Sequence, residues 1–327
     1  MGLYIVLPAL THVISAWPRL SSLAPWWLLV MMVAEVASFF CSMSLLRLVV
    51  RNGSWFAVIT AGLAGNAVTN VLPGGDAAGA SVQFRMLATT GVDPDQAAGG
   101  LAAASVLGLA GLFLLPVFAL PAIVGGVAVS AGLEHAAELG IGGFVLIVAF
   151  GAVVLTTDRT LLNLGAALQW LLNKIPLRHG RTVDLPSRLL AQRDIVRTDL
   201  GRNWWKAVLL IAGRVGLDYV SLLSALRATG ARPNPSLVLL AYAATAVIAL
   251  VPITPGGLGI VEASLTGLLV LAGVPGSSAV VATLAYRLGA YWLPIFGGGF
   301  CYVLFRRRYG PMRSTGGPSS SPGGPPK

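Results

Sequence analysis

The sequence has very little charge for its length. Of its 327 residues only 10% are Asp, Glu, Lys or Arg, whereas 56% are hydrophobic. Soluble domains carry about 25% charged residues, and disordered chains combine low hydrophobicity with high charge. The scarcity of charge therefore excludes both classes and indicates an integral membrane protein with several helical spans.

Cysteine and histidine are scarce as well. The two cysteines and three histidines show no spacing typical of a disulfide framework or a zinc site. The sequence also lacks the G-x-S-x-G motif of hydrolases, the H-E-x-x-H motif of metalloproteases and the P-loop of nucleotide-binding proteins. We therefore expect no metal, no cofactor and no enzymatic activity.

The charge that is present is unevenly distributed. The net charge of +10 arises entirely from residues 157–206 and 306–327, which each carry a net +5. Basic clusters next to membrane spans mark the cytoplasmic side, so nucleic-acid binding is not needed to explain them. The 19 arginines against 3 lysines are typical of a GC-rich bacterial genome. We expect a multi-pass protein of the bacterial cytoplasmic membrane with a cytoplasmic C-terminus.

Apolar runs divide the chain into four parts. We predict an N-terminal membrane half over residues 1–157, a basic cytoplasmic connector over 158–204, a C-terminal membrane half over 205–305 and a disordered basic tail over 306–327. Full-length spans are expected over residues 23–46, 140–157, 205–226 and 277–305, and residues 96–133 are expected to contain one span followed by an outer loop.

The two membrane halves share a repeated pattern. In each half a short apolar segment, a Pro-Gly-Gly break, a second short segment and a Gly-Val turn precede a full span. Pro73 lies 18 residues before Gly91, and Pro255 lies 18 residues before Gly273. Counting spans gives the two units opposite orientations, which predicts an inverted repeat.

The segments around each break are short for a membrane span. They contain 14–17 residues, whereas a crossing helix needs about 20. We therefore predict an all-α, polytopic bundle whose two inverted repeats each carry a re-entrant half-helix hairpin, a layout typical of secondary transporters. Ordinary spans kinked at the breaks are the alternative, because both arrangements return the chain to the same side.

The breaks and the nearby ionisable residues are the candidate substrate site. Helix N-termini bind phosphate and carboxylate groups, and ionisable side chains inside a membrane mark substrate pathways. The predicted substrate-binding residues are Asn70, Pro73, Gly74, Gly75, Asp76, Arg85, Pro255, Gly256, Gly257, Glu262 and Arg287.

Several of these residues also have structural interpretations. Asp76 could cap a helix, and Arg85 could extend to the cytoplasmic surface. Glu262 and Arg287 could pair with each other across a turn, or Arg287 could hold a phosphate while Glu262 responds to protons. The sequence leaves these alternatives open.

Three further ionisable residues lie in apolar segments. Arg214 and Asp218 are four residues apart, so we expect a salt bridge between them on one helix. Glu35 interrupts the apolar run over residues 23–46, and the sequence does not indicate which arginine pairs with it.

Two C-terminal motifs resemble a signature of the lysylphosphatidylglycerol synthase transmembrane-region family. They are Pro-Ile-Thr-Pro-Gly-Gly-Leu-Gly-Ile-Val-Glu-Ala over residues 252–263 and Leu-Ala-Tyr-Arg-Leu-Gly-Ala-Tyr-Trp-Leu-Pro over residues 284–294. Asn-Val-Leu-Pro-Gly-Gly over residues 70–75 is a looser match. The resemblance implies a flippase-like domain with paired re-entrant helices, in which Glu262 and Arg287 match polar positions of the family.

The chain also departs from the family pattern. Some members fuse this region to a soluble aminoacyl-transferase, but only 22 residues follow the last expected span, so we expect a stand-alone member without the synthase domain. Asp76 and Arg85 stand where the family often has Gly-Glu followed by Arg. Residues 104–107 lack the family's Glu-Arg pair, so the family's substrate is not carried over.

These observations favour a lipid flippase. The expected substrate is an anionic phospholipid, glycolipid or polyprenyl-phosphate lipid that moves between leaflets, and a homodimer or a partner membrane enzyme is left open. The alternatives are a membrane-embedded lipid-carrier transferase and a non-transporting membrane scaffold for a partner enzyme.

Overall fold

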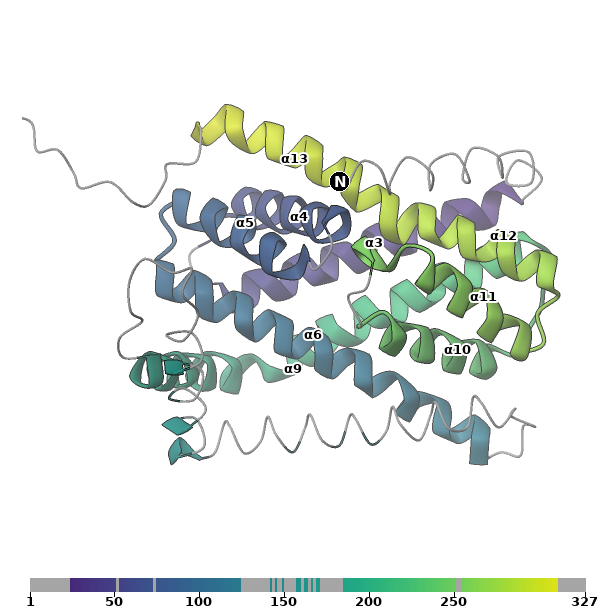
Figure 1. Ribbon diagram of the computed structural model, residues 1–327, viewed down its shortest axis with the longest axis horizontal. Coiled ribbons are helices and arrows are strands. Elements are labelled where there is room, and N and C mark those ends of the chain that lie inside the picture. The colour runs from purple at the N-terminus through teal and green to yellow at the C-terminus, as the bar shows by residue number, and fades with distance from the viewer. Residues whose placement is uncertain are drawn as a thin grey trace, which may run out of the picture.

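The computed structural model describes residues 24–50, 53–72, 75–124, 185–250 and 254–310, with isolated positions between 142 and 170. Over these residues the regular structure is helical throughout, which confirms the predicted class (Figure 1). The elements are α3 (Pro25–Val49), α4 (Trp55–Val71), α5 (Gly75–Thr89), α6 (Pro94–Val124), α9 (Leu185–Ala228), α10 (Pro235–Ile248), η1 (Pro255–Gly257), α11 (Ile260–Leu271), α12 (Gly276–Arg287), η2 (Leu288–Trp292) and α13 (Leu293–Tyr309).

Three helical segments within the described residues are long and apolar enough to cross a membrane. They are Pro25–Val49, Trp204–Ala228 and Gly276–Tyr309, and each agrees with an expected span to within a few residues. Large apolar side chains cover their outer surfaces: Trp26, Phe296 and Phe300 are 65–68% exposed. Such a surface suits lipid, because lipid tails solvate apolar side chains that water would not.

Helix α9 begins earlier than the apolar span within it. The sequence predicts a connector over 158–204, whereas α9 starts at Leu185 and continues without interruption to Ala228. The apolar part of the helix begins at Trp204. The second half of the predicted connector is therefore a helical extension of a membrane-spanning segment.

The two Gly-Val turns have the same geometry. Gly91 and Gly273 both have φ of 88°. The Val92 N–H donates to the carbonyl of Leu87, and the Val274 N–H donates in the same way to Leu269. Both turns are thus Schellman motifs, which end α5 and α11 with a glycine in the left-handed conformation that only glycine adopts without strain.

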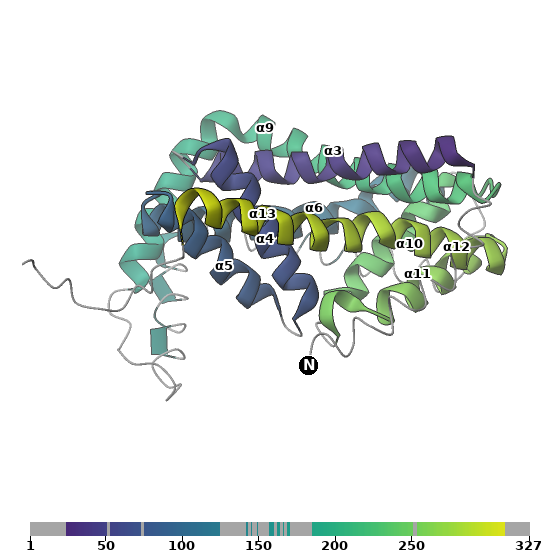
Figure 2. The same ribbon diagram turned by 90° about the horizontal axis from the view of Figure 1, so that it is seen from above.

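Two helical hairpins approach each other from opposite ends of the molecule. Figures 1 and 2 show α4 and α5 in one half, α10 and α11 in the other, and the C-terminal end of α4 close to η1 between them. The contact is direct: the Tyr291 hydroxyl donates to the main-chain carbonyl of Asn70 at 3.0 Å, and α4 packs against η1. The predicted Pro73 and Gly74 lie outside the described residues.

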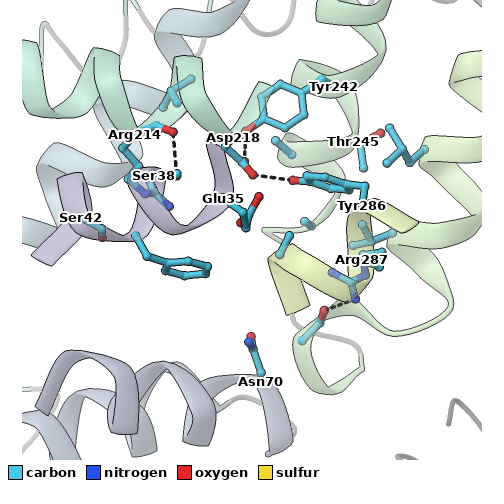
Figure 3. Close-up of a pocket in the computed structure, with 18 of the residues that line it drawn as sticks. Glu35, Ser38, Ser42, Asn70, Arg214, Asp218, Tyr242, Thr245, Tyr286 and Arg287 are labelled. Carbon is cyan, nitrogen blue, oxygen red and sulfur yellow. Dashed lines mark hydrogen bonds between the residues drawn. The ribbon is translucent and has the colours of Figure 1, made fainter. Parts of the chain in front are cut away.

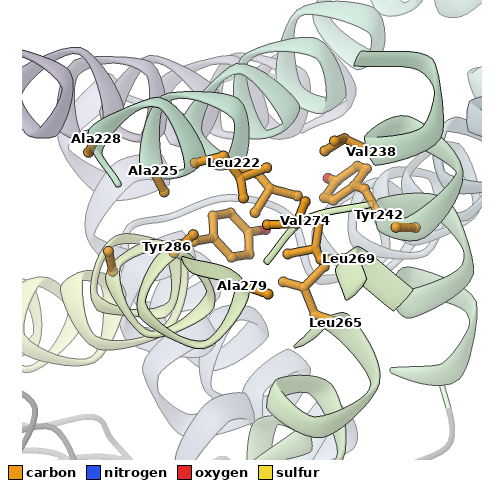
Figure 4. Close-up of a cluster of buried hydrophobic side chains, with 14 of the residues drawn as sticks. Leu222, Ala225, Ala228, Val238, Tyr242, Leu265, Leu269, Val274, Ala279 and Tyr286 are labelled. Carbon is orange, nitrogen blue, oxygen red and sulfur yellow. The ribbon is translucent and has the colours of Figure 1, made fainter. Parts of the chain in front are cut away.

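An apolar core holds the C-terminal half together. Its side chains come from α9, α10, α11 and α12 (Figure 4). Two members, Tyr242 and Tyr286, are large amphipathic rings that are only 8% exposed. Their hydroxyl groups need polar partners inside the protein. The partner of both is Asp218, which lines a cavity between the two halves.

Candidate functional site

A cavity of about 300 Å³ lies where the two halves meet. Its walls come from α3, α4, α9, α10, η1, α11 and the helix formed by α12 and η2 (Figure 3). The polar and charged lining residues are Glu35, Ser38, Ser42, Asn66, Asn70, Arg214, Asp218, Tyr242, Thr245, Tyr286 and Arg287. This lining is unusual for a membrane interior, where polar side chains are costly and mark function.

Asp218 is held by two tyrosines. The hydroxyl of Tyr242 donates to its Oδ2, and the hydroxyl of Tyr286 donates to its Oδ1 at 3.0 Å (Figure 3). Both carboxylate oxygens therefore accept a hydrogen bond from a ring that is anchored in the apolar core. Charge-assisted bonds of this kind are about twice as strong as neutral ones, so they fix Asp218 in place.

The predicted salt bridge between Arg214 and Asp218 is wrong. Asp218 turns to the two tyrosines instead, and no described carboxylate lies within ion-pairing distance of the Arg214 guanidinium. The main chain of Arg214 is fixed differently, because the Ser38 hydroxyl donates to its carbonyl at 2.9 Å and ties α3 to α9. Arg214 therefore shares the cavity with the carboxyl groups of Glu35 and Asp218 and interacts with both electrostatically, but it forms no direct ion pair with either.

Glu35 is the most deeply buried charged side chain of the cavity. It is 2% exposed, and its Oε2 atom has no hydrogen-bond partner among the described residues. No described arginine forms a direct ion pair with Glu35. Arg214 lines the same cavity and is the arginine that interacts with it electrostatically.

Glu262 and Arg287 pair with each other, as one of the two sequence alternatives predicts. Arg287 Nε donates to Glu262 Oε1 at 2.6 Å, and a second guanidinium nitrogen donates to the Gly256 carbonyl at 3.0 Å. Glu262 Oε2 accepts the Gly259 N–H at 2.6 Å and caps α11. We call this set of contacts the clasp. It fixes the second break to α12, and Arg287 stacks on the Tyr291 ring 4.5 Å away.

The structure brings some of the predicted site residues together and leaves others apart. Asn70, Gly256 and Arg287 line the cavity, whereas Glu262, Pro255 and Gly257 support it through the second break. Asn70 donates its side-chain amide to Asn66 at 3.1 Å, so two asparagines form one wall.

The remaining predicted residues lie away from the cavity. Asp76 and Arg85 are exposed on α5. Gly75 is buried against α4. A Cβ atom at this position would lie only 2.4 Å from the Thr69 carbonyl oxygen, so there is no room for a side chain. Its role is thus the close approach of α4 and α5.

Sequence reasoning missed most of the polar wall. Glu35, Arg214 and Asp218 carried a signal, since each interrupts an apolar segment. Tyr242 and Thr245 carried none, because tyrosine and threonine are ordinary in a core helix. Tyr286 lies within the motif over residues 284–294, but the motif gave it no role. No group of three or more His, Cys, Asp or Glu side chains within the described part of the chain is arranged to hold a metal ion.

Comparison with known proteins identifies one match. The model of the family described as "Lysylphosphatidylglycerol synthase TM region" matches residues 2–298 of the chain. No curated protein and no solved structure matches it.

Proposed function

Because the chain belongs to the lysylphosphatidylglycerol synthase transmembrane-region family, whose model covers residues 2–298, we propose that it moves an anionic lipid between membrane leaflets. The family associates the chain with a membrane and with lipid handling. The headgroup would occupy the cavity between the two hairpins while the acyl chains stay in the bilayer.

The guanidinium of Arg214, which lines the cavity and makes no direct ion pair with a described carboxylate, is the observation that carries this proposal. Arginine binds phosphate through two parallel hydrogen bonds, and Arg287 is engaged by Glu262 and the Gly256 carbonyl. Ser42 and Asn66 line the same cavity and offer donors to the phosphate oxygens of a headgroup. The Thr245 hydroxyl donates to the Ala241 carbonyl, so it can only accept a hydrogen bond from a headgroup hydroxyl. An anionic headgroup therefore finds a cation and uncharged donors in one place.

The hairpin geometry supports a carrier rather than a pore. The breaks meet midway along the molecule (Figure 2), and interrupted helices that meet in this way are typical of transporters with a central site. We propose that both hairpins are re-entrant and related as an inverted repeat, a relation favoured by the two identical Schellman turns. Rocking of one half against the other would then open the cavity to either leaflet.

Several further expectations belong to this proposal. We place the protein in the bacterial cytoplasmic membrane with its C-terminus in the cytoplasm, because of its basic segments. We also propose that it transports its lipid without altering it chemically. A homodimer or a partner membrane enzyme stays a prediction.

A reconstitution experiment tests the function. Purified protein is placed in phosphatidylcholine vesicles with a trace of a fluorescent anionic glycerophospholipid, and leaflet exchange is followed by quenching the outer leaflet. We expect faster exchange than in protein-free vesicles. Arg214→Ala should slow it by about tenfold to a hundredfold, since a charge-assisted hydrogen bond contributes about 1.5–3 kcal/mol. The control is Arg227→Ala, an exposed arginine on the same helix, which should keep the wild-type rate.

The outcomes separate the three candidate functions. Lipid exchange that the wild-type protein catalyses and the Arg214→Ala variant does not would support transport. A labelled lipid recovered with an altered headgroup would instead favour a transferase. If the folded wild-type protein exchanges no anionic lipid faster than empty vesicles do, the flippase proposal is wrong.

A further inference from the structure

Glu35 presents an unused oxygen to the cavity. The side chain is 2% exposed and its Oε2 has no hydrogen-bond partner among the described residues. It packs against η2, where a side-chain carbon at Gly289 would lie 3.2 Å from the Glu35 Cγ. Figure 3 shows its carboxyl group beside Asp218, at the edge of the open space that faces Asn70.

The other carboxyl groups near the cavity each accept a hydrogen bond on both oxygens. Asp218 accepts from Tyr242 and Tyr286, and Glu262 accepts from Arg287 and the Gly259 N–H. Because a buried polar atom without a partner is costly and a buried lone charge more so, the free oxygen of Glu35 points to a ligand that neutralises it.

The charges around Glu35 indicate what this ligand is. The titratable groups that line the cavity with it are Arg214 and Asp218 on α9, Tyr242 on α10, and Tyr286 and Arg287 on α12, with Glu262 of α11 paired to Arg287. The two arginines balance Asp218 and Glu262. A charged Glu35 therefore leaves the cavity negative by one unit, and an anionic headgroup beside it would add a second negative charge in a low-dielectric space. A proton on Glu35 removes this repulsion.

We propose that Glu35 binds a proton that travels with the anionic headgroup, so that lipid and proton cross the membrane together in the same direction. The inference rests on the proposed function and assigns it an energy source. Because a proton and a singly charged headgroup are moved as a neutral pair, a pH difference should drive transport, whereas a membrane potential should not. By linkage, each ligand raises the affinity of the cavity for the other.

A pH gradient across the vesicles tests the coupling. With one proton per lipid and a difference of one pH unit, the labelled anionic lipid should accumulate by about tenfold in the leaflet that faces the alkaline side, because each decade of proton activity is equivalent to about 1.4 kcal/mol. A potassium diffusion potential imposed at equal pH should produce no accumulation. Protein-free vesicles report any redistribution that the gradient causes alone.

Glu35→Gln imitates the protonated side chain. Whatever exchange this variant retains should leave the lipid evenly distributed under the same pH gradient. Asp95→Asn is the control, because Asp95 is an exposed carboxyl in the first turn of α6, outside the cavity, and should accumulate lipid as the wild type does. If wild-type protein exchanges lipid but does not accumulate it, the coupling is wrong while the proposed function stands. If it exchanges none, the proposed function itself fails.

Infrared difference spectroscopy provides a readout that does not depend on transport. Acidification of the folded wild-type protein in vesicles with the anionic lipid should produce the carbonyl band of a protonated carboxyl group. This band should be missing in Glu35→Gln and present in Asp95→Asn. An unchanged band in Glu35→Gln would assign the proton to another group and overturn the role of Glu35.

Discussion

The pairing of Glu262 with Arg287 shows how one ion pair can stabilise the place where a helix is interrupted inside a membrane. Arg287 is 11% and Glu262 22% exposed at the side chain, and each also bonds to the main chain of the second break. Main-chain groups released from a helix inside a membrane must find other partners. The clasp meets this need for Gly256 and Gly259, so its first role is to support the turn.

A double-mutant cycle tests the clasp. Glu262→Ala and Arg287→Ala should each lower the stability of the detergent-solubilised protein, because each leaves a partly buried charge without its partner. The double variant should lose less than the sum of the two, with a coupling free energy of about 0.5–3 kcal/mol. Chemical unfolding of the four proteins measures it. Additive losses would mean that the two side chains act independently.

At the scale of elements, close approach between helices depends on a few glycines. Helix α13 packs tightly on α4, and a methyl group at Gly298 would lie 2.3 Å from the Leu63 carbonyl oxygen and 2.6 Å from the Ala67 Cβ. Small residues at such contacts let helix backbones approach within a membrane, where packing rather than the hydrophobic effect drives association. The contact holds the C-terminal helix onto the first hairpin.

Substitution of this glycine tests the contact. Gly298→Ala should lower stability by about 1–3 kcal/mol, the usual cost of an overpacked core, because the main chain of α4 must move. Gly297→Ala is the matched control: its side chain would meet nothing within 4 Å and should change stability little. Equal effects of both substitutions on the unfolding transition would show that α13 does not depend on this contact.

For the whole molecule, the two hairpins and their following helices form opposed halves around one cavity. The α5–α6 turn lies at one end of the long axis and the α11–α12 turn at the other (Figures 1 and 2). Since the long helices α3 and α13 run along this axis, the two turns should face opposite sides of a membrane.

Cysteine labelling in intact cells tests this topology. Cys41 and Cys301 are first replaced by Ala. Asp95→Cys then places one thiol at an exposed position near the start of α6, and Ser277→Cys places one near the start of α12. These are the helices that follow the two Gly-Val turns. We expect a membrane-impermeant reagent to label Ser277→Cys from outside and Asp95→Cys only after the cells are opened. Labelling of both from the same side would contradict the inverted repeat.

The sequence by itself determined the helical membrane class, the positions of three long spans, the second break and the Gly-Val turns. These depend on local properties: apolar runs long enough to span, and proline and glycine where a helix must end. The sequence also anticipated that Glu262 and Arg287 could pair, because they lie in consecutive segments.

Only the tertiary structure decided which polar side chains share the cavity. Glu35 and Asp218 are far apart in the chain but lie side by side in the cavity. Asp218 accepts hydrogen bonds from Tyr242 and Tyr286 and makes no ion pair with Arg214, four residues away on its own helix. Helical spacing brings two side chains near each other, but the partner is decided by which hydrogen bonds the packed helices allow. The cavity exists because the two hairpins meet, and that contact depends on packing between segments that no local pattern encodes.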